Sequence, residues 1–335
     1  MVRIAIIGYG YWGKNLVRNF FSQPDCTLAL VADTDPSRLR SLRQLYPGIA
    51  TTYDIEEVFT NPAIDAVVIA TPVFTHYLLA KRALVAGKHV LVEKPMTASV
   101  MEAEELIELA ERKGKLLMVD HTFLYTGAVE RIKHMIDSSE LGKVNYIDST
   151  RINLGLFQSD INVLWDLAPH DVSICFHLIK EMPYSVQATG MSHTKNGIEN
   201  IAYLTLNYQT DLIAHFNCSW SSPVKIRQML IGGDKKMVLY NDMEPTEKVK
   251  MYDTGFEINS DEDIKKIRVD YRTGDIYTPK LKTTEALTGM ATDFVRSIIN
   301  NTVPVSNWQI GLKVVKVLEG ASQSMKARGK EVALD

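Results

Sequence analysis

The sequence contains few cysteines, no long hydrophobic run and no strong excess of charge. Its three cysteines, Cys26, Cys175 and Cys218, are far apart and form no CxxC pair, which argues against a disulfide framework and fits a reducing compartment. No apolar run reaches the roughly 18 residues of a membrane-spanning helix, and no charged leader with a cleavable apolar segment precedes the first apolar run. A formal net charge of −3 gives no general attraction to nucleic acid or to an anionic membrane. We therefore expect a cytoplasmic protein without a nucleic-acid or membrane partner.

The length and the apolar pattern indicate two domains. A chain of 335 residues with 46% hydrophobic and 23% charged residues is a globular protein too long for one ordinary core. Residues 1 to about 120 alternate apolar strand-like segments with helical patterns. The expected strands are 1–7, 27–32, 66–70, 89–92 and 115–119, and the expected helices are 15–21, 36–46, 74–86 and 99–113. Continuous apolar strands between helices predict a parallel sheet covered on both faces, so the fold class is α/β, with a doubly wound Rossmann sheet in residues 1–122.

The pattern changes after about Tyr125, where hairpin-like strands replace the strand–helix alternation. Helices are expected at 127–138 and from about Ala168, and alternating strands at 186–190, 201–208, 212–218 and 227–231. Residues 242–282 are charged and show no clear pattern, and two helices at 285–300 and 307–326 end the chain. We expect residues 123–335 to form an α+β domain with a mainly antiparallel, open sheet, whose last helices are candidates to pack back on the first domain.

A glycine-rich turn follows the first strand. Gly8, Gly10 and Gly13 form a GxGxxG pattern that leads into a helical segment, and Asp33 ends the second strand. In a dinucleotide-binding turn the first glycine makes the tight turn, the second allows the pyrophosphate to approach, and the third lets helix and strand pack closely. The carboxylate would accept hydrogen bonds from the adenosine ribose. The complete strand, turn, helix, strand and acid order favours dinucleotide binding over an ordinary strand–turn–helix.

Ligands of an open parallel sheet bind beyond the carboxyl ends of its strands. In the first domain these ends carry Thr71-Pro72, Glu93-Lys94-Pro95 and Asp120-His121. Lys94 directly follows a buried strand, and Pro95 keeps it out of helical geometry. The residue pattern alone leaves a catalytic lysine and a solvated surface lysine open.

A second polar cluster runs from Trp165 to Asp171. With Pro169 in the first turn of a helix, Asp166 would lie just before the helix and His170 just inside it. A carboxylate beside a histidine can fix its tautomer and support proton transfer. A capping aspartate with a structural histidine is the alternative, and no HExxH-type or cysteine-rich spacing supports a metal site.

These residues together resemble the glucose–fructose oxidoreductase/inositol dehydrogenase (Gfo/Idh/MocA) family. The matching pieces are Gly8 to Gly13, Ala70-Thr71-Pro72 with His76, the block from Ala86 to Pro95, and Asp166 to Asp171. The resemblance implies a working NAD(P)-dependent dehydrogenase acting on CH–OH groups, with the catalytic residues Lys94, Asp166 and His170 and no metal. The cofactor residues that we expect on these grounds are Gly8, Gly10, Tyr11, Trp12, Gly13, Asp33, Arg38, Thr71, Pro72, His76, Glu93, Lys94 and His121.

The resemblance and the residues also bear on cofactor, assembly and substrate. Asp33 favours NAD over NADP, although Arg38 keeps NADP open. The family often forms dimers or tetramers through an open sheet. Apolar residues on both faces of 201–208 predict a homodimer or homotetramer here, with Tyr203 and Leu206 on one side and Leu204 and Tyr208 spread on both.

The amino-acid sequence from Asn153 to Asp171 resembles that of family members found in polysaccharide and nucleotide-sugar pathways. It favours oxidation at C3 of a nucleoside-diphosphate sugar, with inositol or free-sugar oxidation and a non-catalytic NAD sensor as alternatives. Besides Lys94, Asp166 and His170, the expected substrate residues are Tyr125, Arg151, Asn153 and Asn162, with further polar groups at Gln158, Lys225 and Arg227.

Overall fold

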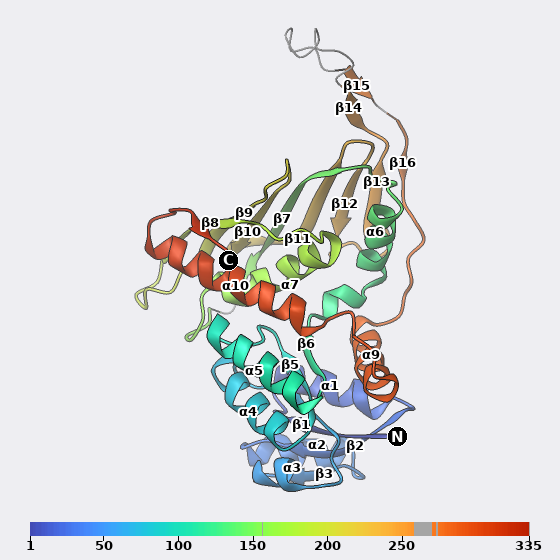
Figure 1. Cartoon of the computed structure of the whole chain (residues 1–335), viewed down its shortest axis with the longest axis vertical. Coiled ribbons are helices and arrows are strands. Elements are labelled where there is room, and N and C mark those ends of the chain that lie inside the picture. Colours follow the sequence, from blue (N-terminus) through green and yellow to red (C-terminus); the bar gives the residue numbers. More distant parts are fainter. Residues whose placement is uncertain (156, 258–269, 273, 335) are drawn as a thin grey trace. The chain divides into compact units, whose positions relative to one another are not determined.

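The structure is a computed structural model that describes residues 1–155, 157–257, 270–272 and 274–334 (Figure 1). The chain divides into two compact units. The first comprises Met1–Tyr125 and Thr284–Lys316, and the second comprises Thr126–Thr283 and Val317–Asp335. Residues 284–316, which our two-domain division placed with the second domain, thus belong to the first unit. Each unit is described by itself.

The first unit is built on a six-stranded parallel sheet with strand order β3-β2-β1-β4-β5-β6. This confirms the doubly wound α/β sheet. The strands are β1 (Val2–Ile7), β2 (Cys26–Ala32), β3 (Ala50–Thr52), β4 (Ala66–Ile69), β5 (His89–Glu93) and β6 (Leu117–Asp120). The helices are α1 (Tyr11–Phe21), α2 (Pro36–Leu45), α3 (Glu56–Thr60), α4 (Val73–Val85), α5 (Val100–Lys113), η1 (Thr122–Tyr125), α9 (Ala286–Asn300) and the first part of α10 (Trp308–Lys326).

Local sequence signals explain where these helices begin and end. Asp35 caps α2 by accepting a hydrogen bond from the Ser37 amide, and Ser99 caps α5 by accepting one from the Glu102 amide. Gly114 ends α5 in the left-handed region at φ +61°, where a side chain is unfavourable. The strand order brings the carboxyl ends of β1, β4, β5 and β6 to one edge of the sheet, which is the edge that carries the predicted cofactor residues.

The second unit contains a nine-stranded sheet with the order β16-β13-β12-β11-β7-β10-β9-β8-β17. Among the described strand pairs, β10 and β7 are parallel and the others of this sheet are antiparallel, so the sheet is mainly antiparallel as predicted. The strands are β7 (Val144–Leu154), β8 (Ser185–Met191), β9 (Ile201–Asn207), β10 (Ile213–Ser219), β11 (Ser221–Gly233), β12 (Met237–Asn241), β13 (Val249–Tyr252), β16 (Ile276–Tyr277) and β17 (Val332–Ala333). A separate pair is formed by β14 (Gly255–Glu257) and β15 (Asp270–Arg272). The described helices of this unit are α6 (Gly127–Asp137), α7 (Val163–Leu178) and the last part of α10.

Helix α7 packs on β10, β7 and β9 and buries one face of this sheet, as Figure 1 shows. On β9 the buried side chains are Ala202, Leu204 and Leu206, and the alternating residue Tyr203 is 46% exposed. Side chains three apart on a strand point to opposite faces, so our placement of Tyr203 and Leu206 on one side was wrong. The outer face carries exposed apolar groups at Tyr203, Ile213 and Leu230.

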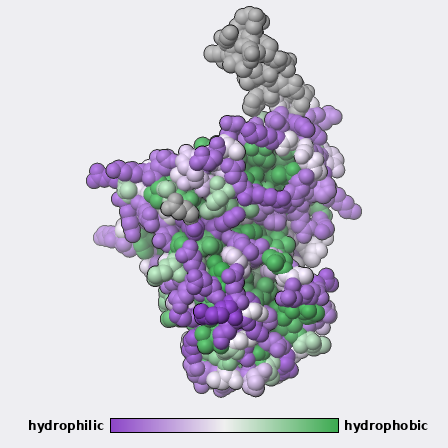
Figure 2. Space-filling view, viewed as in Figure 1, coloured by the Kyte–Doolittle hydropathy of each residue, from purple (hydrophilic) through white to green (hydrophobic). Residues whose placement is uncertain are grey.

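The surface is largely hydrophilic, and Figure 2 shows smaller apolar areas among polar side chains on the visible face. No helix in the described part of the chain is long and apolar enough to cross a membrane. Cys26, Cys175 and Cys218 are free and buried, as expected for structural thiols.

Candidate active site

The glycine turn after β1 has the geometry that dinucleotide binding needs. Gly8 adopts φ +98°, and a Cβ there would lie 2.3 Å from the carbonyl oxygen of Ala70. A Cβ on Gly13 would lie 2.1 Å from the carbonyl oxygen of Gly8, so close helix–strand packing excludes a side chain. At Gly10, by contrast, the nearest atom to a Cβ is Nη1 of Arg38 at 3.8 Å, which leaves the backbone open to a ligand.

The N-terminus of α1 fits a pyrophosphate. Gly10 is the N-cap and supplies no side-chain acceptor, and no acidic residue lies in the first turn. Amide groups of such a turn point outward with a partial positive charge, which favours an anion. Tyr11 and Trp12, predicted to contact the cofactor, are 81% and 45% exposed beside this turn. The residues present therefore fit the diphosphate of a dinucleotide.

Asp33 lies at the end of β2 and organises the turn. Its Oδ2 accepts a hydrogen bond from the Tyr9 amide at 2.6 Å, and its Oδ1 accepts one from the Asp35 amide at 2.8 Å. Arg38 Nη1 lies 3.5 Å from Asp33 Oδ2, and the Arg38 side chain is half-exposed. A carboxylate has about four acceptor positions, so Asp33 can hold the turn and still accept from a ribose hydroxyl.

His76 on α4 connects two loops instead of facing a ligand. Its ring is buried, with Nδ1 2.9 Å from the carbonyl oxygen of Pro95 and Nε2 2.8 Å from that of Thr71. Burial lowers the pKa of His76 below its ordinary value. This geometry argues against the direct cofactor contact that we expected of His76. It ties the loop after β4, which contains Thr71 and Pro72, to the loop that carries Lys94.

Glu93 and Asp120 end the neighbouring strands β5 and β6 and face each other in register. Lys94 follows β5 at once, and His121 follows β6. His121 is buried, and burial lowers its pKa to about 3, so the ring is neutral at physiological pH. In the described part of the chain, neither ring nitrogen of His121 has a hydrogen-bond partner. Polar groups thus gather where parallel-sheet topology places a ligand.

Helix α7 begins five residues before the predicted start at Ala168. Asn162 is its N-cap and accepts hydrogen bonds from the amides of Leu164 and Trp165 at 3.2 Å each. Asn162 also donates to Glu199 at 3.2 Å, so this predicted substrate residue has a local structural role. The placement of Pro169 in the first turn was wrong, because it lies inside the helix.

The earlier start changes how the predicted catalytic pair is held. Asp166 and His170 are both inside α7 and four residues apart, so they lie on one helix face. Asp166 Oδ2 accepts a hydrogen bond from Nε1 of Trp220 at 2.9 Å, and Trp220 is buried. The indole fixes the orientation of the carboxylate. No local pattern pointed to Trp220, because the contact joins residues 54 positions apart.

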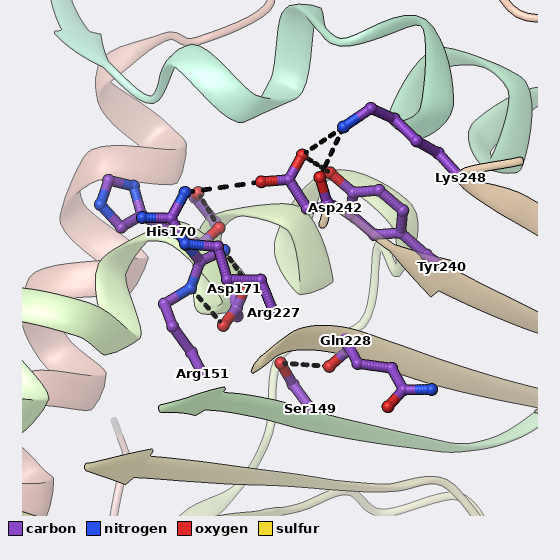
Figure 3. A network of polar contacts seen from close by, with 10 residues as sticks. Ser149, Arg151, His170, Asp171, Arg227, Gln228, Tyr240, Asp242 and Lys248 are labelled. Atoms are coloured by element: carbon purple, nitrogen blue, oxygen red, sulfur yellow. Dashed lines mark hydrogen bonds and ion pairs between the residues drawn. The ribbon is translucent and has the colours of Figure 1, made fainter. Parts of the chain in front are cut away.

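Arg151 on β7 does not present its charge to an exposed ligand. Its guanidinium is buried and makes two hydrogen bonds to Asp171, at 2.8 Å from Nε and 2.6 Å from Nη2 (Figure 3). Asp171, the residue after His170, is also buried. This geometry argues against the substrate contact that we expect of Arg151 from the sequence, because the ion pair with Asp171 anchors α7 on the sheet.

Tyr125 is likewise engaged inside its own unit. Its hydroxyl donates to Asp293 Oδ2 at 2.7 Å and accepts from the Ser306 amide at 3.1 Å, and the residue is buried. Burial raises the pKa of Tyr125 far above its ordinary value. The substrate contact expected of Tyr125 is therefore not supported.

Cationic side chains remain partly exposed at the end of the second sheet nearest Asp171. Arg227 on β11 is the register partner of Arg151, and its Nη1 lies 3.5 Å from Asp242 Oδ2. Lys248 Nζ lies 3.1 Å from Asp242 Oδ1 (Figure 3). The side chains of Arg227 and Lys248 are 35% and 33% exposed, so two cations share one carboxylate at the surface. Asn153 on β7 is half-buried, as is Gln158, and Lys225 is exposed.

Comparison with known proteins agrees with this geometry. The profile described as "Oxidoreductase family, NAD-binding Rossmann fold" (GFO_IDH_MocA) matches residues 2–121, and the GFO/IDH/MocA C-terminal domain matches residues 129–239. The chain belongs to the GFO/IDH/MocA oxidoreductase family. Its first unit therefore carries the family's NAD-binding Rossmann domain, and the open glycine turn is the part of that domain that fits the diphosphate.

The relatives of this family member differ in what their names say they act on. The chain is 36% identical over 148 residues, 44% of its length, to the 1-carboxy-3-chloro-3,4-dihydroxycyclohexa-1,5-diene dehydrogenase of Comamonas testosteroni. It is 29% identical over 224 residues, 62% of its length, to the scyllo-inositol 2-dehydrogenase (NADP(+)) IolW of Bacillus subtilis. The matches span 37% and 60% of those relatives.

Solved structures extend the similarity over the whole chain. The UDP-N-acetylglucosamine 3-dehydrogenase of Acidithiobacillus ferrooxidans aligns with a TM-score of 0.81 at 21% identity, covering 97% of this chain and 98% of that one. At this identity the match shows the shared fold. In the described part of the chain no group of three or more His, Cys, Asp or Glu side chains could hold a metal ion.

Proposed function

We propose that this family member is an NAD-dependent dehydrogenase that transfers hydride between a sugar secondary hydroxyl carbon and nicotinamide C4, with C3 of a nucleoside-diphosphate sugar as the favoured position. The observation that carries the proposal is the pairing of Asp166 and His170 on one face of α7, with Trp220 fixing the carboxylate. Lys94 at the strand-end edge of the first unit completes the proposed set.

Each residue has a distinct task in this proposal. His170 takes the hydroxyl proton when the sugar is oxidised, and Lys94 donates a hydrogen bond to the same oxygen and stabilises the developing alkoxide. Asp166 orients the imidazole, and the Trp220 indole keeps Asp166 from rotating. When bound, the nicotinamide cofactor would supply the hydride chemistry, and the glycine turn with Asp33 would hold it. The chain's own contribution is positioning and proton transfer.

The nucleotide-sugar assignment rests on fewer residues than the sequence suggested. Arg151, Asn162 and Tyr125 are committed to structural contacts, which leaves Arg227 as the partly exposed arginine next in register. An arginine is a natural partner for a diphosphate. The named activity of the UDP-N-acetylglucosamine 3-dehydrogenase that shares the fold adds support.

Oxidation of an inositol or a free sugar is the second candidate. It is favoured by two scyllo-inositol 2-dehydrogenases of Bacillus subtilis, 29% and 30% identical over 62% and 56% of this chain. Arg151 is buried and therefore does not support binding of a substrate that carries a diphosphate.

A screen tests the proposal. Purified protein is mixed with NAD or NADP and with nucleotide sugars, free sugars and inositols, and the absorbance of reduced cofactor is followed. Turnover of a nucleotide sugar, inhibited competitively by UDP or a related diphosphate, is expected. Turnover of inositol or hexose with no inhibition by diphosphates at millimolar concentration selects the second candidate.

Variants of α7 test the roles. His170→Gln should lose about 10²- to 10⁴-fold in kcat, while His177→Gln, on the same helix but outside the proposed site, serves as the matched control. Equal activity of the His170 and His177 variants would remove His170 from the mechanism.

A further inference from the structure

Two carboxyl groups meet at the edge of the first sheet. Glu93 is the last residue of β5, Asp120 is the last residue of β6, and the two are register partners on parallel strands. Register partners on parallel strands point their side chains to the same side of the sheet, and the strands lie about 4.8 Å apart. Two buried carboxylates held this close disfavour double ionisation, so one of them keeps its proton.

The surroundings of the pair identify which group holds that proton. Asp120 is buried and accepts a hydrogen bond from the Thr122 hydroxyl. A hydrogen bond donated to a carboxylate favours its ionised form. Glu93 accepts less: its Oε1 is buried and has no partner in the described part of the chain. The arrangement therefore favours Glu93 as the protonated acid and Asp120 as the anion.

Four titratable groups from the neighbouring elements act on this pair or lie beside it. His121 is neutral, and burial also lowers the pKa of His76 and raises that of Tyr125, which is bonded to Asp293. Lys94 is the remaining one, and its positive charge lowers the pKa of both carboxyl groups. The pair and this ammonium are thus the charged elements of the cluster.

We infer that Glu93 and Asp120 share a single proton at neutral pH and present one negative charge, not two, to the ammonium of Lys94. Burial, which raises the pKa of Glu93 well above its usual range, supports the same assignment. The pair acts on the reaction through Lys94, so Glu93 and Asp120 are positioning residues here.

The consequence for catalysis rests on the proposed role of Lys94. Two ionised carboxylates would hold the ammonium in a strong double ion pair and compete with the substrate oxygen. One shared proton halves that charge, so the ammonium is balanced but remains able to donate to a reacting oxygen. The carboxyl pair itself is testable without any substrate.

Infrared spectroscopy observes the proton directly. At neutral pH the full chain, without substrate, should show the carbonyl stretch of a protonated carboxylic acid, shifted in D₂O. Glu93→Gln should abolish this band, and Glu111→Gln, an exposed position on α5, should leave it unchanged. A wild-type spectrum without the band overturns the inference.

The pH dependence of stability gives a second test with a definite sign. A carboxyl whose pKa is raised by folding destabilises the protein progressively as pH rises above its unfolded value of about 4.3. Glu93→Gln lacks this loss, so its denaturation midpoint should gain on wild type between about pH 4 and pH 7. If Glu93 were ionised and paired with Lys94, the variant would instead fall behind over that interval.

A lysine comparison tests the coupling. Because Lys94 lowers the pKa of both carboxyl groups, Lys94→Met should keep the infrared band to higher pH than wild type. Lys115→Met, which lies before β6 at the opposite end of that strand, should not. If the infrared band titrates at the same pH in both variants, the carboxyl pair is not coupled to Lys94. This outcome does not depend on which sugar the enzyme uses.

Discussion

Replacing Arg151 by methionine distinguishes a structural arginine from a substrate-binding one. The Arg151 and Asp171 side chains are 4% and 7% exposed and joined by two short hydrogen bonds. Removing the guanidinium leaves a buried, uncompensated carboxylate, which costs about 3–5 kcal/mol. We therefore expect Arg151→Met to lower the free energy of unfolding by that amount, measured by urea denaturation.

A double variant separates the ion pair from the space that it fills. Arg151→Met with Asp171→Leu removes both charges, and such replacements are often neutral or stabilising by about 1–4 kcal/mol. The double variant should thus recover most of the stability lost by the single one. Arg227→Met is the matched control on the adjacent strand; because its ion pair is longer and partly exposed, about 1 kcal/mol or less is expected.

Kinetics decide between the two roles. If Arg151→Met loses less than about 1 kcal/mol of stability but raises KM for a nucleotide sugar at unchanged kcat, the arginine provides uniform substrate binding. That outcome would refute the anchoring role and restore the phosphate contact. A large stability loss that Asp171→Leu relieves would support the anchor.

Three further outcomes are expected. Lys94→Ala should reduce turnover by about 10²- to 10⁴-fold with NAD affinity, measured by calorimetry, largely kept; retention of more than about half the activity would reject the assignment. NAD should have the higher kcat/KM, because Asp33 repels a 2′-phosphate, and Asp33→Ala should move the preference toward NADP through Arg38; equal wild-type efficiency with NADP would contradict this. Light scattering should give two or four times the monomer mass of 37.7 kDa. Tyr203→Glu on the outer sheet face should reduce the mass to that of the monomer, whereas Leu45→Glu on α2 should not. A wild-type mass near 37.7 kDa would contradict the assembly.

The parts of the fold that follow from local sequence signals were predictable. Apolar strands between capped helices identified the parallel sheet, and the roles assigned to Gly8 and Gly13 match the atoms that a Cβ would strike. These signals work because turn geometry and strand periodicity are set within a few residues. Strand β7 was missed, since its polar residues, Arg151 among them, hide the alternation expected of a half-buried strand.

The start of α7 was misplaced for a comparable reason. Pro169 is common in the first helical turn, so it suggested a start near Ala168, whereas the Asn162 cap sets the start at Val163. A proline inside a helix loses one backbone hydrogen bond, and packing of α7 on three strands compensates for that loss. Tertiary contacts therefore outweighed the local preference.

The least predictable feature was which charged residues face a ligand and which hold the fold. Arg151 and Arg227 are register partners and look alike in the sequence, yet one is buried against Asp171 and the other is partly exposed beside Asp242. The difference arises because helix α7 packs on β7 and thereby brings its Asp171 within hydrogen-bond distance of the Arg151 guanidinium. Charge pairing of this kind is decided after the chain has folded, so the residues that anchor His170 emerge only from the structure.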